Sequence, residues 1–350
     1  MGDRSHQAAC QRLAVEELDE VGYLQIPETC PVCKSKSPLI QYTPNKKQKT
    51  AVNYRCAWDY CRFFGSALSF SNVLPQHAGR GMTPDKVKQA IQTYTSAGIT
   101  HPAGVQATAK QCGCGTKPIA RLFNAPVNKE AQLGKGLDRR TILNKNVEVD
   151  GHLIRTGSLS QAKAMRLYPH LVAEWRKRQP NKKLPKYFLM PLVVLGAFQR
   201  GSDKMLLAPG RLKLVAPGGK PGTESLPDVR GANFFERVSP NSVVFPDGAV
   251  AWVTGADEAD RNLATAAVVH QKQQFVLKDR RLKRQGASKW RGTQAADRRW
   301  DGLDSWIGRN TTTLVKGKPN PMLWQRIRSY QWRSKNTIKD LYVQLGKACK

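Results

Sequence analysis

The sequence predicts a mixed α/β protein with two small modules ahead of its main domain. From about residue 141 onward, strand-like apolar runs are followed by helical patterns, which is typical of a sheet covered by helices. Ahead of them lie two closely spaced cysteine pairs and then short segments with helix start and stop signals. A chain of 350 residues, 40% of them hydrophobic, can build cores for two or three modest domains.

The chain is strongly basic, with 57 Lys and Arg against 26 Asp and Glu and a formal net charge of +31. Such an excess repels itself unless an anionic partner is near, and nucleic acid is the usual one because neutralised phosphates release counterions. A ribosome-like or membrane-surface basic protein is the alternative. The longest apolar run, 187–198, is too short to span a bilayer, and the N-terminus has no signal-peptide pattern, so we expect no membrane partner.

Cysteine spacing over residues 28–70 predicts a zinc ribbon. "TCPVCKSK" supplies a C-x2-C pair, and "YRCAWDYCRFFG" supplies a C-x4-C pair about 22 residues later. Four thiolates on two tight turns form the closed tetrahedral shell of a structural Zn²⁺, whereas four unrelated buried thiols are the alternative. The predicted zinc ligands are Cys30, Cys33, Cys56 and Cys61. Residues 1–27 are expected to be an N-terminal tail.

Three short helices are expected over residues 80–135. Thr83 is a plausible N-cap with Pro84 at the first helical position, and Thr116 caps the last helix. Short helices joined by Gly-containing turns resemble a helix-turn-helix, with Lys117 and Arg121 near the start of the recognition helix as DNA contacts. The alternative is a small helical connector in which Cys112 and Cys114 pack.

The main domain is expected over residues 141–336, followed by a tail at 337–350. Strands are predicted at 146–157, 186–201 and 204–218, with a further strand ending at Asp247 and a helix over 257–274. A helical insertion near 158–186, closed by a basic loop, separates the first two strands. The basic run 176–186 would also serve as a nuclear import signal in a eukaryotic host, whereas a bacterial host implies the cytoplasm or nucleoid.

Acidic residues are scarce, yet two of them stand at strand positions. Asp150 lies within a strand, where aspartate is disfavoured, while Asp247 before Gly248 could be an ordinary turn residue. An acid in a first strand, another at the end of a later strand and a third on a late helix is the arrangement of the RNase H-like nuclease and transposase core. Three such carboxylates hold two divalent ions, Mg²⁺ or Mn²⁺, for phosphodiester displacement.

The motif order over roughly residues 28–336 resembles the IS1595-type, or ISXO2-like, DDE transposases. The similarity rests on the zinc ribbon, the helix-turn-helix pattern, "VEVDG", "VVFPDGAVAW", "VVHQKQQFV" and "LDSWIG" in that order. It implies that the N-terminal modules bind double-stranded transposon ends, that the chain works as a homo-oligomer, and that the RNase H-like domain cuts and joins DNA.

The resemblance also implies a set of site residues. Asp150 and Asp247 match the first and second catalytic acids, and His270 matches a histidine that follows the second. Asp304 corresponds to the third acid, with Asp301 as the near alternative. The third acid is Asp where the family has Glu, and Gly151-His152 replaces the usual Glu-Thr. A domesticated, catalytically inactive DNA-binding relative is therefore one alternative, and a zinc-ribbon RNA- or ribosome-associated protein is the other.

Two late segments interleave cations with aromatic residues. Residues 277–292 carry seven cations against one acid, and "MLWQRIRSYQWRSKN" at 322–336 alternates Trp, Tyr and Arg. Cations position phosphates, whereas the aromatic residues of the second segment can equally form the buried stripe of a helix. The predicted DNA contacts in these segments are Lys278, Arg280, Arg281, Lys283, Arg284, Arg326, Arg328 and Arg333.

Overall fold

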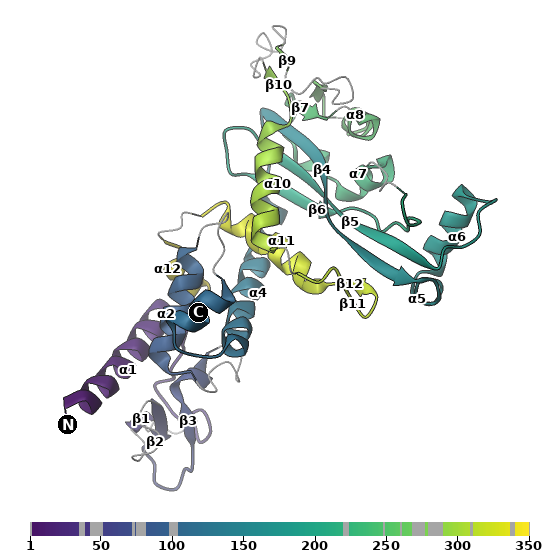
Figure 1. Ribbon diagram of the computed structural model, residues 1–350. Helices are drawn as coiled ribbons and strands as arrows, with labels where there is room; N and C mark the ends of the chain where they lie inside the picture. The colour runs from purple at the N-terminus through teal and green to yellow at the C-terminus, as the bar shows by residue number, and fades with distance from the viewer. Residues whose placement is uncertain are drawn as a thin grey trace. The chain divides into compact units, whose positions relative to one another are not determined.

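The chain forms two compact units in the computed structural model (Figure 1). The first unit comprises Met1–Gln132 with Asn336–Lys350, and the second comprises Leu133–Lys335. The structure describes residues 2–34, 39–42, 52–71, 74, 82–97, 104–219, 224–247, 249–259, 261–267, 277–278, 290–308, 311–336 and 340–349.

The first unit combines a small antiparallel sheet with helices. The sheet has the order β1-β2-β3 and lies within the predicted ribbon range 28–70. Its strands are β1 (Leu39–Tyr42), β2 (Asn53–Cys56) and β3 (Phe64–Ser66), followed by a 3-10 turn, η1 (Ala67–Phe70). The helices are α1 (Gly2–Val21), α2 (Pro84–Ser96), α3 (Val105–Gln111), α4 (Thr116–Arg140), which continues into the second unit, and α12 (Leu341–Cys349).

Helix α2 begins where its capping signals predict. Thr83 is the extended N-cap residue, and Pro84 occupies the first helical position, where a missing N–H costs no hydrogen bond. Val87, Ile91 and Tyr94 recur at helical spacing and form its buried stripe. The next two helices, α3 and α4, follow within the range expected for the helical module, and α4 runs on to Arg140, beyond that range.

The two predicted tails are largely helical, which corrects the sequence expectation. Ala14, Val15 and Leu18 of α1 are buried, and α1 packs against both α2 and α12. Leu341 and Leu345 recur at helical spacing on the buried face of α12. Both apolar stripes are short, and the helices that cover them lie far away in the sequence, so these partners cannot be read from a local pattern.

The second unit is built on a five-stranded mixed sheet of order β6-β5-β4-β7-β8. Strand β4 pairs antiparallel with β5, and β5 pairs antiparallel with β6; β4 pairs parallel with β7, and β7 pairs parallel with β8. The strands are β4 (Asn146–Ser160), β5 (Tyr187–Gln199), β6 (Met205–Pro209), β7 (Val243–Pro246) and β8 (Ala264–Thr265).

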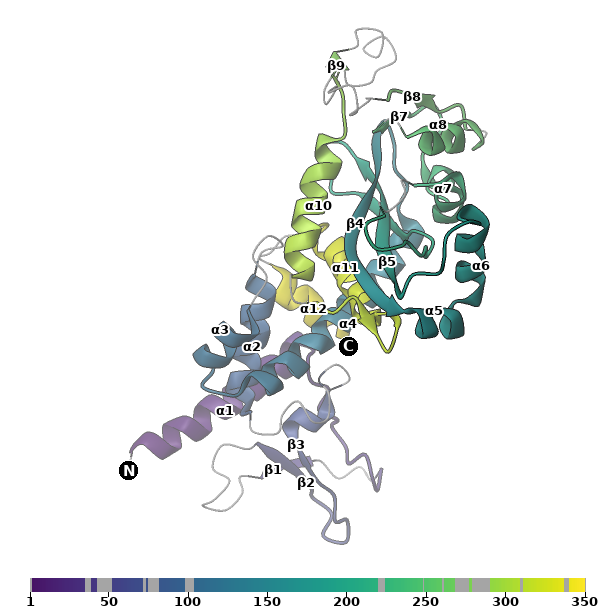
Figure 2. The same cartoon turned by 45° about the vertical axis from the view of Figure 1, so that its right-hand side comes forward.

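Helices cover the two faces of this sheet (Figure 2). Val147 and Val149 of β4 face one side, where they join a core with Val229 of α7 (Leu226–Ala232) and Trp252 of α8 (Val250–Asp257). The intervening polar residues of β4 face α10 (Gln294–Ile307), because side chains alternate along a strand. Helix α11 (Pro321–Arg333) packs against α10.

Two helices, α5 (Gln161–Leu167) and α6 (Pro169–Arg178), lie between β4 and β5, inside the range given for the insertion. Leu171 and Trp175 of α6 pack on Phe188 of β5, so the insertion has its own small core. The remaining elements are the turn η2 (Phe235–Arg237) and the short pairs β9 (Leu277–Lys278) with β10 (Trp290–Arg291) and β11 (Leu314–Val315) with β12 (Lys318–Pro319).

The prediction of a helix over residues 257–274 is wrong for the part of this range that the structure describes. Helix α8 ends at Asp257, and Ala264–Thr265 instead extends the sheet beside β7. The backbone of Ala266 donates a hydrogen bond to Val244, so pairing with a buried strand outweighs the helix propensity of this alanine-rich run. Residues 268–276, which include His270, lie outside the described residues.

Candidate functional site

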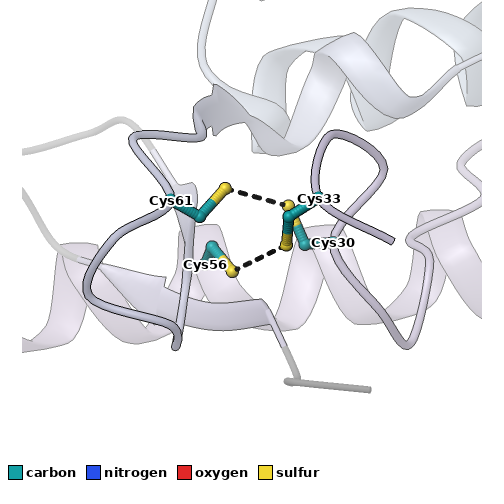
Figure 3. A group of neighbouring side chains, drawn as sticks. All are labelled: Cys30, Cys33, Cys56 and Cys61. Atoms are coloured by element: carbon teal, nitrogen blue, oxygen red, sulfur yellow. Dashed lines mark hydrogen bonds between the residues drawn. The ribbon is translucent and has the colours of Figure 1, made fainter. Parts of the chain in front are cut away.

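The four predicted zinc ligands lie together in the first unit (Figure 3). The ligand atoms of Cys30, Cys33, Cys56 and Cys61 all lie within 4.8 Å of one another. Sulfur–sulfur distances are 3.7 Å between Cys30 and Cys61 and 3.6 Å between Cys33 and Cys56. Four sulfurs about 2.3 Å from one zinc ion at tetrahedral angles stand roughly 3.8 Å apart. The cluster therefore has the dimensions of a four-cysteine zinc site and could hold such an ion.

Backbone geometry also suits thiolate ligands at this cluster. The amide of Trp58 donates to Cys56 Sγ at 3.4 Å, and the amide of Cys61 closes the knuckle by donating to the carbonyl of Trp58 at 2.9 Å. Burial and hydrogen bonding to the other thiols raise the pKa of Cys56 to about 12. A bound cation would favour the thiolate form at neutral pH and release protons as it binds.

Asp150 and Asp247 lie on neighbouring parallel strands of the second unit. Val149 of β4 pairs with Pro246 of β7, so the next residue on each strand is an aspartate. Burial raises the pKa of Asp150 to about 7, with a further contribution from the charge of Asp247. Asp247 Oδ1 accepts a hydrogen bond from the amide of Ala249 at 3.1 Å, so the residue also shapes the turn after the strand. The fold brings the two acids to neighbouring strands although 97 positions separate them in the sequence.

Glu224 is a third acid near this pair, and the sequence prediction missed it. A β-carbon at Gly151 would overlap the Glu224 carboxylate, so the absence of a side chain there leaves room for this acid beside β4. Burial raises the pKa of Glu224, as does the charge of Asp247, and Glu224 in turn contributes to the raised pKa of Asp150. The sequence held one signal of this neighbour. Gly151 directly follows the strand acid Asp150, and a larger residue there would occupy the space that the Glu224 carboxylate fills.

Helix α10 contacts the polar face of β4 at three successive levels. The Glu148 carboxylate accepts from the amide of Ala296 at 2.8 Å, and Trp300 Nε1 donates to Asp150 Oδ2 at 2.8 Å. One helical turn further, His152 Nε2 and Asp304 Oδ2 lie 3.1 Å apart. Steps of two residues along the strand match steps of four along the helix, since both advance about 6–7 Å.

The position of α10 separates the two candidates for the third acid. Asp304 faces β4, where it contacts His152 and lies 3.6 Å from Arg155 Nη1. Asp301 is exposed. The Asp304 carboxylate is thus engaged with two basic side chains one level away from Asp150. The His152 ring stacks on Trp300 with 5.1 Å between centroids, which holds the indole against Asp150.

Among the described residues, the cysteines are the one group of three or more His, Cys, Asp or Glu side chains with ligand atoms within 4.8 Å of one another. The acids Asp150, Asp247, Glu224 and Asp304 are therefore not drawn together as tightly as the cysteines. Beyond the effect of burial, the charge of Asp247 raises the pKa of both Asp150 and Glu224, and the charge of Glu224 adds to the rise at Asp150.

A basic groove of about 520 Å³ leads away from Ser225, the residue after Glu224. Its walls are α6 and the segment 211–219, and its cations are Arg178, Lys182, Arg211 and Lys213. Lys213 pairs with Asp228 at 2.7 Å, and Arg178 lies 4.0 Å from Glu174, whereas Lys182 and Arg211 are exposed at the surface. The groove can attract an anionic chain.

Three predicted DNA contacts have partners within the domain, and the buried one, Arg333, must be corrected. Arg333 is only 1% exposed and stacks over Trp306, with its guanidinium carbon 4.4 Å from the ring centroid. Arg328 pairs with Asp138 at 3.0 Å. Arg326 donates to the carbonyl of Ile307 and to Thr311. Because α11 packs against α10, Arg333 is buried, whereas Arg326 and Arg328 are half-buried beside these partners.

The remaining DNA-contact predictions have different outcomes. Lys117 and Arg121 are exposed near the start of α4. Lys278 lies in β9, and nothing is described of its side chain. Arg280, Arg281, Lys283 and Arg284 lie outside the described residues.

The chain matches no protein-family model, no curated protein and no solved structure. Among the described helices, none has both the length and the apolar character needed to cross a bilayer. The acids, the cysteines and the basic surfaces are therefore the features that point to a function.

Proposed function

We propose that this chain is a DNA-cleaving and DNA-joining enzyme of the DDE transposase type, with an RNase H-like domain behind a zinc ribbon and a helix-turn-helix module. The observation that carries the proposal is that Asp150 and Asp247 directly follow Val149 and Pro246, which pair in the parallel register of β4 and β7. An RNase H-like sheet has three antiparallel strands continued by two parallel ones. The order β6-β5-β4-β7-β8 agrees with that pattern.

The residues present suit divalent cations with oxygen ligands. Asp150 and Glu224 have raised pKa values because burial and neighbouring negative charge disfavour ionisation, and a cation would relieve both effects. Mg²⁺ or Mn²⁺ held by Asp150, Asp247 and Glu224 would supply Lewis-acid activation of the attacking and leaving oxygens. Glu224 thus replaces Asp304 as our candidate for the third acid.

Other side chains of the domain have supporting roles in this proposal. Trp300 orients Asp150 through its indole hydrogen bond, and the His152–Asp304 contact keeps Trp300 in place by stacking. The basic groove beside Ser225 provides a path for the phosphate backbone toward the acids. Lys117 and Arg121 of the helical module are candidates for duplex contacts.

A nicking assay on supercoiled DNA with Mg²⁺ or Mn²⁺ tests the proposal. We expect the parent protein to nick, and Asp247→Asn and Glu224→Gln to lower the rate ~100-fold or more, because a lost metal ligand removes several kcal/mol of transition-state stabilisation. Asp301→Asn is the matched control at an exposed acid and should leave the rate unchanged. Asp304→Asn should cost less than Glu224→Gln.

Three other results of the nicking assay would change the proposal. Loss of activity in Asp304→Asn with activity retained in Glu224→Gln would restore Asp304 as the third acid. A parent protein that binds DNA without metal-dependent nicking would favour the inactive DNA-binding alternative. Equal activity in the parent and Asp247→Asn would reject the proposed site.

A further inference from the structure

The cysteine-bearing module exposes an unusual set of aromatic rings. Trp58 is 47% exposed, Tyr60 is 86% exposed and Phe64 is 55% exposed. Large aromatic side chains more often bury their rings, so three exposed rings in a span of seven residues indicate a surface used for binding. We call Trp58, Tyr60, Phe64 and the cations Arg55 and Arg62 the aromatic face of the module.

The cysteine cluster explains why the first two rings point outward. Trp58 and Tyr60 lie within the four-residue knuckle between Cys56 and Cys61, whose sulfurs both belong to the cluster. The backbone of the knuckle is occupied by its hydrogen bonds to Cys56 Sγ and within the turn. The two rings contact each other edge-on with 5.9 Å between centroids, leaving ring surface accessible on the outside.

The strands of the same module carry a second set of exposed side chains in a cross-strand row. Ile40 of β1 pairs with Arg55 of β2, and Arg55 pairs with Phe64 of β3, so the three side chains stand level on one face of the small sheet. All three are exposed. The row places a guanidinium directly beside a phenyl ring, the combination that binds a phosphate next to a stacked base.

Local charge favours nucleic acid over a protein partner. Among the described residues of the module, Lys34, Arg55 and Arg62 are exposed cations and Glu28 and Asp59 are exposed acids, and only Asp59 lies within the knuckle that carries Trp58 and Tyr60. Base faces are covered in a duplex and become available for stacking only when strands are unpaired. We propose that the aromatic face binds single-stranded nucleic acid, with its rings stacking on unpaired bases and its cations contacting the backbone. This role goes beyond the proposed duplex recognition and is independent of the catalytic acids.

Fluorescence anisotropy on the full-length, zinc-loaded protein provides the test. The probes are a labelled 20-nucleotide single strand and a labelled 20-base-pair duplex. We expect Trp58→Ala and Tyr60→Ala each to weaken single-strand binding roughly 5- to 150-fold and to change duplex binding less than twofold, because each lost ring removes one stacking contact. Arg62→Gln should instead lower the salt slope for the single strand by about 0.7.

Matched variants separate ring stacking from apolar contact and from misfolding. Val32→Ala removes an exposed aliphatic side chain, 65% accessible, from the same module and should leave both affinities unchanged. Trp58→Phe should retain most single-strand binding because it keeps a ring. Zinc content, measured for every variant, should equal that of the parent.

Photo-crosslinking with a single strand containing 5-iodouracil gives an independent readout and is expected to modify Trp58, Tyr60 or Phe64. Unchanged single-strand affinity in the Trp58→Ala/Tyr60→Ala double variant would overturn the inference, as would crosslinks confined to other segments. An equal loss of duplex binding, or altered self-association with single-strand binding intact, would assign the face to another partner.

Discussion

At the scale of single residues, the position of Asp150 in the sheet disfavours the ionised form of its carboxylate. It is a strand residue packed under α10, and burial raises its pKa to about 7, with Asp247 adding to the rise and the Trp300 hydrogen bond opposing it. Ionising this side chain is therefore less favourable in the folded protein than in the unfolded chain. Such a mismatch is typical of residues retained for a function and not for stability.

Asp150→Asn should therefore stabilise the metal-free protein at neutral pH. Because the folded pKa is above the unfolded value of 3.8, the contribution of Asp150 is most favourable below pH 4 and is lost as pH rises toward about 7. The gain in Tm from Asp150→Asn, measured in EDTA, should accordingly be small at pH 4 and several degrees at pH 8. Asp301→Asn is the exposed control, and the same pH trend in that variant would contradict the explanation.

At the scale of elements, two helices approach closely at one glycine. Gly134 of α4 lies against α11, where an added β-carbon would overlap the carbonyl oxygen of Arg328. Asp138, one turn further along α4, pairs with Arg328, and Gln331 donates to the same carboxylate at 3.1 Å. The close approach thus aligns the ion pair that makes Arg328 a structural residue instead of a DNA contact.

Gly134→Ala should destabilise the protein by about 1–3 kcal/mol or more, because backbone cannot move aside as a flexible side chain can. Gly136→Ala is the matched control on the same helix, since its β-carbon would meet only the end of the Arg140 side chain at 3.9 Å. That change should be neutral or stabilising by up to ~1 kcal/mol, as alanine favours helix more than glycine does. Urea denaturation measures both, and equal midpoints would contradict the packing argument.

At the scale of the whole molecule, the two units have different sources of stability. The five-stranded sheet has apolar cores on its faces, whereas the cysteine-bearing module has strands of three or four residues and few buried side chains. Small modules with little core depend on metals or other cross-links. We therefore expect zinc to stabilise one part of the molecule selectively.

Zinc chelation should raise hydrogen–deuterium exchange within residues 28–70 while β4 and β5 remain protected. Mass spectrometry of peptides from the intact chain measures this, with Cys10→Ser as a control that leaves the cluster complete. Restored protection on adding zinc would show that the change is reversible. Unchanged exchange in the module after complete zinc removal would mean that its fold does not depend on the metal.

Local patterns predicted much of this structure. Hydrophobic periodicity located most strands of the sheet, capping residues located the start of α2, and cysteine spacing identified the four clustered thiols. The failures share a cause: residues 264–265 became a strand because β7 offered an edge to pair with, and the expected tails became helices because distant helices cover their apolar sides. Neither partner is visible in a local window.

The sequence alone determined the positive charge, the mixed α/β composition, the cysteine cluster and Asp150 and Asp247 as candidate acids. Only the tertiary structure decided that these two acids follow paired residues of adjacent strands, that Glu224 joins them beside Gly151, and that Arg333 is buried. The cysteine pairs of the cluster lie on local turns, so their spacing can be recognised in the sequence. Which strands lie side by side in a sheet depends on the packing of the whole domain. A site assembled from distant strands is therefore seen only in the folded structure.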